Sequence, residues 1–157
     1  NEIYYPKLKY IPNEQGKLKN YYKSCFWGQQ VITSSSVCLN KQLLIENNLF
    51  ELFPAGVKRG EDLHAWTCLN LNNDTYFINK PLVRINSVID NVSNSGYNIN
   101  ESFNYTKWLS YKTNTVGKKI FLVFLVLKRQ FVIFKKLILR KKLKDINILI
   151  KRFFKLN

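Results

Sequence analysis

The fold of this chain is decided by one stretch, Arg59-Gly60-Glu61-Asp62-Leu63-His64-Ala65-Trp66. Two adjacent carboxylates, Glu61 and Asp62, follow a glycine and begin a segment whose apolar residues recur every three positions. This spacing predicts a helix over residues 61–71 with one buried side. Carboxylates in a first helical turn are favoured by the helix dipole, and a helix would hold a general base in a fixed direction.

Length and composition predict one modest folded domain. The chain has 157 residues, of which 46% are hydrophobic and 15% aromatic, so it can bury a core. The formal net charge of +15 is concentrated at one end: residues 118–157 hold 13 of the 25 Lys and Arg and a single acid, Asp145. Because the first 117 residues are nearly balanced, the high net charge is a weak argument for nucleic-acid binding.

The three cysteines, Cys25, Cys38 and Cys68, stand far apart, and the chain has one histidine. Without a C-x-x-C pair or a His cluster, no metal site is predicted within this chain. A sparse, odd cysteine count is typical of a reducing compartment. The start of the sequence lacks Met and the pattern of a signal peptide, so we interpret the chain as a piece of a longer protein.

The rest of the chain divides into short elements. We expect a short helix near residues 18–26 within an irregular start, a β-favouring strand at 29–38, and a helix at 41–48 that Asn40 could cap. A loop over 49–60 precedes the helix at 61–71. Strand pieces are expected at 75–79 and 82–85, a flexible loop at 86–100, a helix at 100–108, and a boundary at Gly117.

Five of these elements agree in order and spacing with the acceptor-side half of family-2 glycosyltransferases, which the chain resembles over about residues 18–90. They are the Thr/Ser-rich residues 33–37, the helix at 41–48, the Phe-rich loop at 49–54, Gly60-Glu61-Asp62 followed by Trp66, and Asn79-Lys80-Pro81-Leu82. The resemblance implies an α/β fold: a partial GT-A-like glycosyltransferase domain, its C-terminal half, over residues 1–117.

The same resemblance implies an activity. A sugar would pass from a nucleotide-sugar donor to a glycan or lipid-linked acceptor in bacterial surface polysaccharide synthesis. Asp62 would take the proton of the acceptor hydroxyl, and Glu61 would help to orient or bind the acceptor. This chemistry is reasonable because a carboxylate within hydrogen-bond reach can act as general base, and a second carboxylate nearby can raise its pKa.

Candidate substrate-binding side chains are Thr33, Ser34, Ser35, Trp66 and Arg84. The hydroxyl residues would line the acceptor pocket, although hydroxyls in a strand are more often ordinary strand residues. Trp66 suits a core or pocket wall better than a platform for sugar stacking. Arg84 could pair with a diphosphate, with an ordinary ion pair as the alternative. The lone histidine, His64, is expected to be an exposed helix residue.

Other parts of the family pattern are missing from the chain. Similar enzymes carry an Asp-x-Asp motif that holds a divalent metal, Mg or Mn, on the donor diphosphate, and this sequence has none. It also lacks G-x-G-x-x-G and P-loop motifs. We therefore expect the donor-binding half, and with it the metal of the complete enzyme, to lie outside this chain.

The sequence of residues 118–157 predicts a basic amphipathic helical tail. The apolar run at 120–127 is far shorter than the roughly 20 residues that span a bilayer. Leu127, Phe131, Phe134 and Ile138 fall on one helical face, with Lys and Arg along the same helix. We expect the tail to lie on an anionic membrane surface, placing a cytoplasmic protein at the inner face of the cytoplasmic membrane; docking on a protein partner is the alternative.

Two readings of the whole chain compete. In the first, it is part of a sugar transferase held at the membrane. In the second, it is a non-enzymatic membrane-surface binding module with a transferase-like body. A basic nucleic-acid binder is a third and weakest reading. A nucleic-acid partner is not expected, because the aromatic residues of the tail lie within apolar runs and do not alternate with basic residues as stacking platforms.

Overall fold

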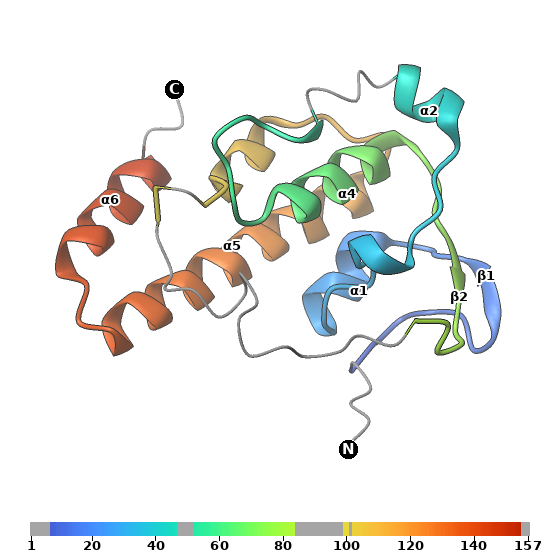
Figure 1. The fold of residues 1–157 in the computed structure, drawn as a ribbon, viewed down its shortest axis with the longest axis horizontal. Helices are drawn as coiled ribbons and strands as arrows, with labels where there is room; N and C mark the ends of the chain where they lie inside the picture. The colour runs from blue at the N-terminus through green and yellow to red at the C-terminus, as the bar shows by residue number, and fades with distance from the viewer. Residues whose placement is uncertain (1–6, 47–51, 84–98, 101, 155–157) are drawn as a thin grey trace.

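Helices make up most of the fold, and the structure, a computed structural model, describes residues 7–46, 52–83, 99–100 and 102–154. The elements are β1 (Gln15–Lys17), α1 (Tyr21–Trp27), the 3-10 helix η1 (Ser34–Ser36), α2 (Lys41–Glu46), α4 (Glu61–Asn72), β2 (Tyr76–Ile78), the 3-10 helix η3 (Tyr105–Ser110), α5 (Val116–Leu139) and α6 (Leu143–Phe154). Figure 1 shows α1 and α4 against one part of α5, with the strands at one end of the molecule and α6 at the other.

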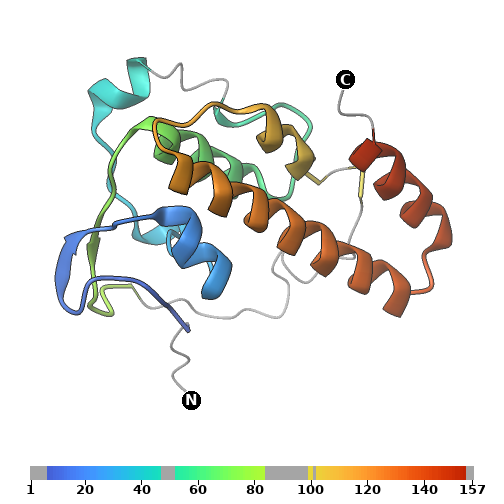
Figure 2. The same cartoon turned by 180° about the vertical axis from the view of Figure 1, so that it is seen from behind.

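Helix α5 is the centre of the main core. Its side chains Leu122, Leu125 and Val126 are fully buried and cluster with residues of α1 and α4, among them Tyr22 and Leu63. Seen from behind in Figure 2, α5 crosses most of the width of the molecule. The first half of the basic segment at 118–157 thus supplies core residues to the body of the protein.

Three lysines of α5 bind the carboxyl ends of other helices. Lys128 Nζ donates to the carbonyl oxygens of Cys25, Phe26 and Gly28 at 2.6–3.0 Å, at the end of α1. Lys118 Nζ does the same at the end of α4, and Lys119 Nζ at the end of η3. The last carbonyls of a helix lack intrahelical partners and carry partial negative charge. A lysine ammonium group therefore donates hydrogen bonds to them and also stabilises that charge.

The small sheet confirms one predicted strand. β2 lies within the expected segment 75–79 and pairs antiparallel with β1, with Gly16 opposite Phe77. The strand expected at 29–38 is wrong, because residues 34–36 form η1. There the Thr33 and Ser36 hydroxyls lie 2.6 Å apart, and Ser36 N donates to the Thr33 carbonyl. Such local hydrogen bonds of Ser and Thr compete with strand pairing.

The other expected elements fare differently. Helix α1 confirms the one near residues 18–26, and α2 the one from residue 41, with the Asn40 side chain accepting from Gln42 N. The helix expected at 100–108 is confirmed only in its second half and as a 3-10 helix, since η3 begins after Asn104. Phe103, which precedes η3, donates a backbone hydrogen bond from its N atom to the Arg59 carbonyl. The residues before η3 are therefore paired with the residues that lead into α4. Leu82 and Val83 are not in a strand, and the loop expected at 86–100 lies almost wholly outside the described residues.

A second, smaller core joins α5 to α6. It consists of Ile99, Ile133, Leu137 and Leu149. The turn between the two helices puts Lys141 in the left-handed region, at φ 52°. Lys142 N donates to the Leu137 carbonyl and Lys141 N to the Ile138 carbonyl. This is the hydrogen-bond pattern of a Schellman C-cap, whose left-handed position usually holds glycine.

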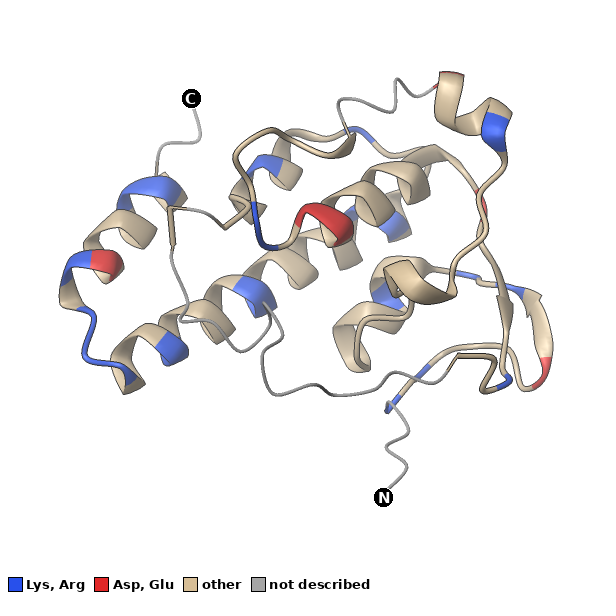
Figure 3. Cartoon of the chain, in the orientation of Figure 1, with Lys and Arg blue, Asp and Glu red and all other residues tan. Residues whose placement is uncertain are grey.

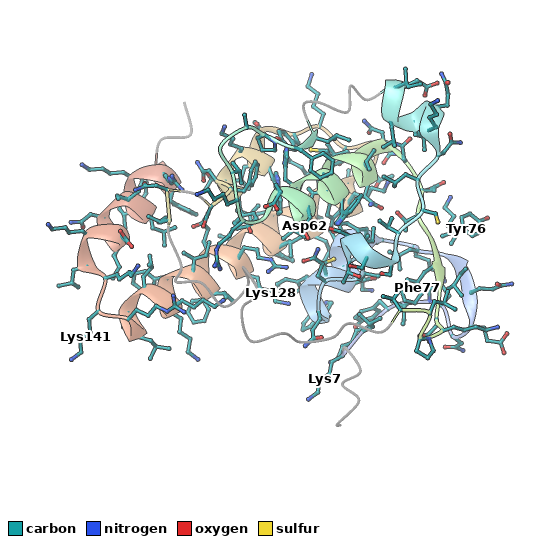
Figure 4. All side chains as sticks on the ribbon, viewed as in Figure 1. Lys7, Asp62, Tyr76, Phe77, Lys128 and Lys141 are labelled. Atoms are coloured by element: carbon teal, nitrogen blue, oxygen red, sulfur yellow. The ribbon has the colours of Figure 1, made fainter. Side chains whose placement is uncertain are left out.

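Lys141→Gly is therefore expected to raise the free energy of unfolding by about 1 kcal/mol, because glycine adopts positive φ without steric cost. Figure 4 shows Lys141 at the corner between α5 and α6, away from the cores. Urea denaturation measures the change, with Lys144→Gly as a control that should be destabilising because it lies inside α6. A loss of stability in Lys141→Gly would contradict this C-cap.

Among the helices that the structure describes, none is both long and apolar enough to cross a membrane.

Candidate functional site

The Asp62 carboxylate stands in the first turn of α4, as predicted. Gly60 precedes the helix in the left-handed conformation, at φ 82°. Asp62 Oδ1 accepts a hydrogen bond from Leu63 N at 2.6 Å, which fixes the carboxylate against the helix start. Asp62 Oδ2 accepts a longer bond, 3.4 Å, from the Ser34 hydroxyl. Figure 4 shows the labelled Asp62 at this end of α4.

Glu61, the neighbouring acid, is half-buried. Its Oε2 atom is buried and accepts no hydrogen bond. A buried carboxylate oxygen without a donor is costly, and most buried polar atoms in folded proteins are paired with protein or with ordered water. The two carboxylates therefore differ: Asp62 is oriented by its own helix, while Glu61 retains an acceptor atom that a donor could still satisfy.

The predicted hydroxyl residues lie together on or just before η1. Thr33, Ser34 and Ser35 are exposed, and Ser34 is the one whose hydroxyl reaches Asp62. Thr33 instead bonds within its own turn, to Ser36. The segments of residues 33–36 and 60–62, far apart in sequence, thus meet at the entry of α4.

The remaining candidates take other places. Trp66 is 4% exposed and belongs to the main core, so its ring is not open to a sugar. Its Nε1 has no hydrogen-bond partner. Arg84 lies outside the described residues.

The expectation for His64 is wrong: it is a core residue, 5% exposed. Its Nδ1 accepts a hydrogen bond of 3.1 Å from Trp108 Nε1, and its ring stacks on Phe103 with centroids 4.1 Å apart. An accepting Nδ1 cannot carry a proton, so this geometry requires the neutral imidazole with its proton on Nε2. Sequence reasoning missed the pair because Trp108 lies 44 residues further along the chain.

Gly60 is required at the entry of α4 for two reasons. Its φ of 82° is unfavourable for other residues, and a Cβ atom there would lie 3.1 Å from Tyr105 Cζ and collide with the Tyr105 hydroxyl. Gly60→Ala is expected to lower the free energy of unfolding by about 2–4 kcal/mol, from backbone strain plus overpacking. Thermal or urea unfolding measures the loss.

Gly56 supplies the matched control. Its φ is 75°, but a Cβ there would meet nothing within 4 Å. Gly56→Ala should therefore cost only the backbone term of about 1–2 kcal/mol. Adding Tyr105→Phe to Gly60→Ala should restore part of the lost stability, since it removes the colliding oxygen. Equal losses in the two alanine variants would contradict the proposed contact with Tyr105.

Within the described part of the chain, no three or more His, Cys, Asp or Glu side chains are grouped so that they could hold a metal ion. The polar side chains at the α4 entry are two carboxylates and a hydroxyl. These groups suit proton transfer and the binding of hydroxyl groups.

Comparison of the chain with protein-family models, curated proteins and solved structures finds no significant match. The family assignment therefore remains a prediction from the sequence pattern. The described elements are mainly helical with a two-stranded sheet, and the expected partial GT-A-like α/β domain also remains a prediction.

Proposed function

We propose that this chain is the acceptor-side part of a glycosyltransferase, with Asp62 as its general base. The observation that carries the proposal is the contact between Asp62 and Ser34 at the entry of α4. It brings together the Glu-Asp pair and the Thr/Ser-rich segment, the two parts of the pattern that the resemblance assigns to the acceptor.

In the proposed reaction, the acceptor hydroxyl lies within hydrogen-bond reach of Asp62 Oδ2, at about 2.6–3.2 Å. The hydroxyl oxygen forms a bond to the anomeric carbon of the donor sugar as its proton passes to the carboxylate. The bond to the donor diphosphate breaks, and the nucleoside diphosphate leaves with the electron pair. Glu61, the neighbouring acid of the first turn, would help to orient or bind the acceptor.

The donor and its metal would be held outside this chain. A divalent Mg or Mn ion on the diphosphate would stabilise the leaving group's charge. The residues described at the α4 entry offer it no cluster of ligands.

The test uses the polypeptide as its source cell makes it, with its length determined by intact mass spectrometry. It is incubated with radiolabelled nucleotide-sugars and a lipid extract of the same cells as acceptor. Incorporation of label into the lipid or glycan fraction supports the proposal. Release of free sugar alone, with no glycosylated product for any donor, would contradict it.

We further propose that α5 and α6 lie on an anionic membrane surface, as a peripheral attachment at the cytoplasmic face. Six apolar side chains spaced four and three apart form an exposed stripe along α5: Ile120, Phe124, Leu127, Phe131, Phe134 and Ile138. Phe131 is the most exposed of them, at 67%. This is the face predicted from the sequence, and α5 buries its opposite face in the protein.

The charge around the stripe suits anionic lipids. Exposed bases of this region are Lys135, Lys136, Arg140, Lys141, Lys144 and Lys151. Figure 3 shows blue segments along α6 and the turn before it. Asp145 is the acidic residue in the first turn of α6. Each Lys or Arg near an anionic surface contributes about 1 kcal/mol, and an apolar face inserted at the headgroup level adds to this.

Sedimentation with vesicles tests the attachment. The protein is expected to bind phosphatidylcholine vesicles that contain phosphatidylglycerol, and this binding should weaken as the salt concentration rises. Under the same conditions it should not bind DNA of similar charge. Phe131→Ser should weaken binding about tenfold or more, because it removes an aromatic side chain that would be buried in the membrane surface. Tyr76→Ser, an exposed apolar residue on β2, should leave it unchanged. Equal effects of the two substitutions would contradict the proposed face.

The alternative function is a non-enzymatic membrane-surface module. The exposed α5 stripe favours it independently of the acids at α4. Vesicle binding through Phe131 together with a complete absence of transfer would establish this alternative over the enzyme.

A further inference from the structure

A basic cavity lies between the entry of α4, the segment before η3 and the middle of α5. Its volume is about 90 Å³, and its lining residues are Arg59, Ser102, Tyr105, Arg129, Val132, Ile133 and Lys136. Arg129, Val132, Ile133 and Lys136 are spaced three, four and seven apart, so they share one face of α5. The opposite wall is fixed by the bridge between Arg59 and Ser102 and by Phe103 N, which donates to the Arg59 carbonyl.

The far side of the cavity wall is held in place by α6. Arg152 Nη1 donates to the Ile99 carbonyl at 2.7 Å and more weakly to the Ser102 carbonyl. The Thr106 hydroxyl donates to the Arg152 carbonyl. The cavity is therefore formed by three segments that are each tied down by hydrogen bonds.

The lining carries positive charge and a donor that is not satisfied. Three of its side chains are cationic, and no described carboxylate lines it. The Nε atom of Arg129 is buried and donates to no acceptor. A buried donor of a charged group costs free energy when it is left unpaired, and an anion in the cavity would supply the opposite charge that the described lining lacks.

We propose that this cavity binds a phosphate or diphosphate ester. A guanidinium group presents paired donors that match two oxygens of a phosphate, whereas a carboxylate ligand would use fewer of the donors gathered here. Lys136 adds a second charge from the same helix face, two turns further along α5, and Tyr105 and Ser102 add uncharged side chains to the wall.

The cavity is close to the proposed base. Arg59 stands three residues before Asp62, so their Cα atoms are at most about 11 Å apart even for a fully extended chain. Figure 3 shows the basic residues that lead into α4 directly beside its acidic first turn. Resting on the proposed function, this places an anchoring site for an acceptor phosphate next to the group that deprotonates the acceptor hydroxyl. A sugar linked to a phosphorylated lipid is an acceptor of this chemistry.

The experiment is a calorimetric titration of the whole chain with inorganic pyrophosphate at constant ionic strength. Saturable binding of one pyrophosphate per chain is expected. Arg129→Gln should weaken it about tenfold or more, because a hydrogen-bonded charge is lost. Arg129→Lys should give an intermediate loss, since it keeps the charge and loses the paired donors. Lys136→Gln is a second variant in case Arg129→Gln does not fold, as judged by circular dichroism.

Lys135→Gln is the matched control, because it removes the same charge one residue away from Lys136, outside the cavity lining. Its binding should stay within about twofold of the unchanged protein, as for an exposed charge. Equal losses in Lys135→Gln and Lys136→Gln, or an absence of saturable binding, would overturn the proposal.

Two further titrations identify the source of the phosphate. A soluble short-chain alkyl diphosphate represents a lipid-linked acceptor, and short-chain phosphatidic acid represents a membrane headgroup. The ligand that binds more tightly, and whose binding is lost in Arg129→Gln, identifies the source of the phosphate. Asp62→Asn should bind pyrophosphate as the unchanged protein does. Failure of this site is thus distinguishable from failure of the proposed base, which only a transfer assay measures.

Discussion

Replacing Asp62 with Asn is expected to lower the rate of sugar transfer about 10²–10⁴-fold, the usual contribution of a general base. The amide has the size and shape of the carboxylate but cannot take the acceptor proton. Its oxygen can still accept from Leu63 N, as Asp62 Oδ1 does, so the start of α4 should remain intact. Initial rates with the native-length polypeptide measure the effect, and thermal unfolding checks the fold.

Two other acids give the matched controls. Asp74 lies at the surface, just past the far end of α4, and pairs with Lys17 at 2.6 Å, so Asp74→Asn removes the same charge away from the entry of α4 and should leave transfer unchanged. Glu61→Gln should mainly raise the KM for the acceptor, since Glu61 is proposed to orient it. An Asp62→Asn variant that keeps most of its activity would mean that another group takes the proton.

Replacing Trp108 with Ala is expected to lower the free energy of unfolding by about 3–5 kcal/mol, as for other buried tryptophans. Trp108 is fully buried, and its ring lies 4.9 Å from that of Tyr105. The substitution leaves a cavity and also removes the donor to His64 Nδ1, which would remain buried without its partner. Urea denaturation followed by circular dichroism measures the loss.

Trp27 provides the control, since its side chain is 51% exposed at the end of α1. Trp27→Ala should cost less than about 1 kcal/mol because little area is lost from the core. Trp108→Phe should be intermediate: it keeps an aromatic ring but loses the indole donor and part of the buried ring volume. If Trp108→Phe were as stable as the unchanged protein, the hydrogen bond to His64 would make no net contribution.

Elements that depend on neighbouring residues were predictable from the sequence. Helix α4 begins at Glu61 as expected, because the glycine before it, the acids in its first turn and the apolar spacing all act within a few residues. β2 follows from its β-favouring side chains. The candidate base Asp62 is placed by the same local signals, whereas its contact with Ser34, 28 positions earlier in the chain, depends on the tertiary structure.

The segment at residues 33–36 shows where local reasoning fails. Its β-favouring composition predicted a strand, yet the Thr33 and Ser36 side chains bond to each other and to the turn. A strand also needs a partner to pair with. The partner that β2 finds is β1, in a stretch with no strand pattern of its own, about sixty residues earlier in the chain.

Sequence alone determined the helix that carries Asp62 and the apolar face of α5 that ends at Ile138. Both follow from periodicity, which is a property of neighbouring residues. Only the tertiary structure decided that α5 buries its other face, that Lys128 binds the end of α1, that His64 is a buried acceptor, and that Arg59 and Arg129 line one cavity. These contacts connect residues that are tens of positions apart in the sequence. Such contacts depend on how whole helices pack against one another.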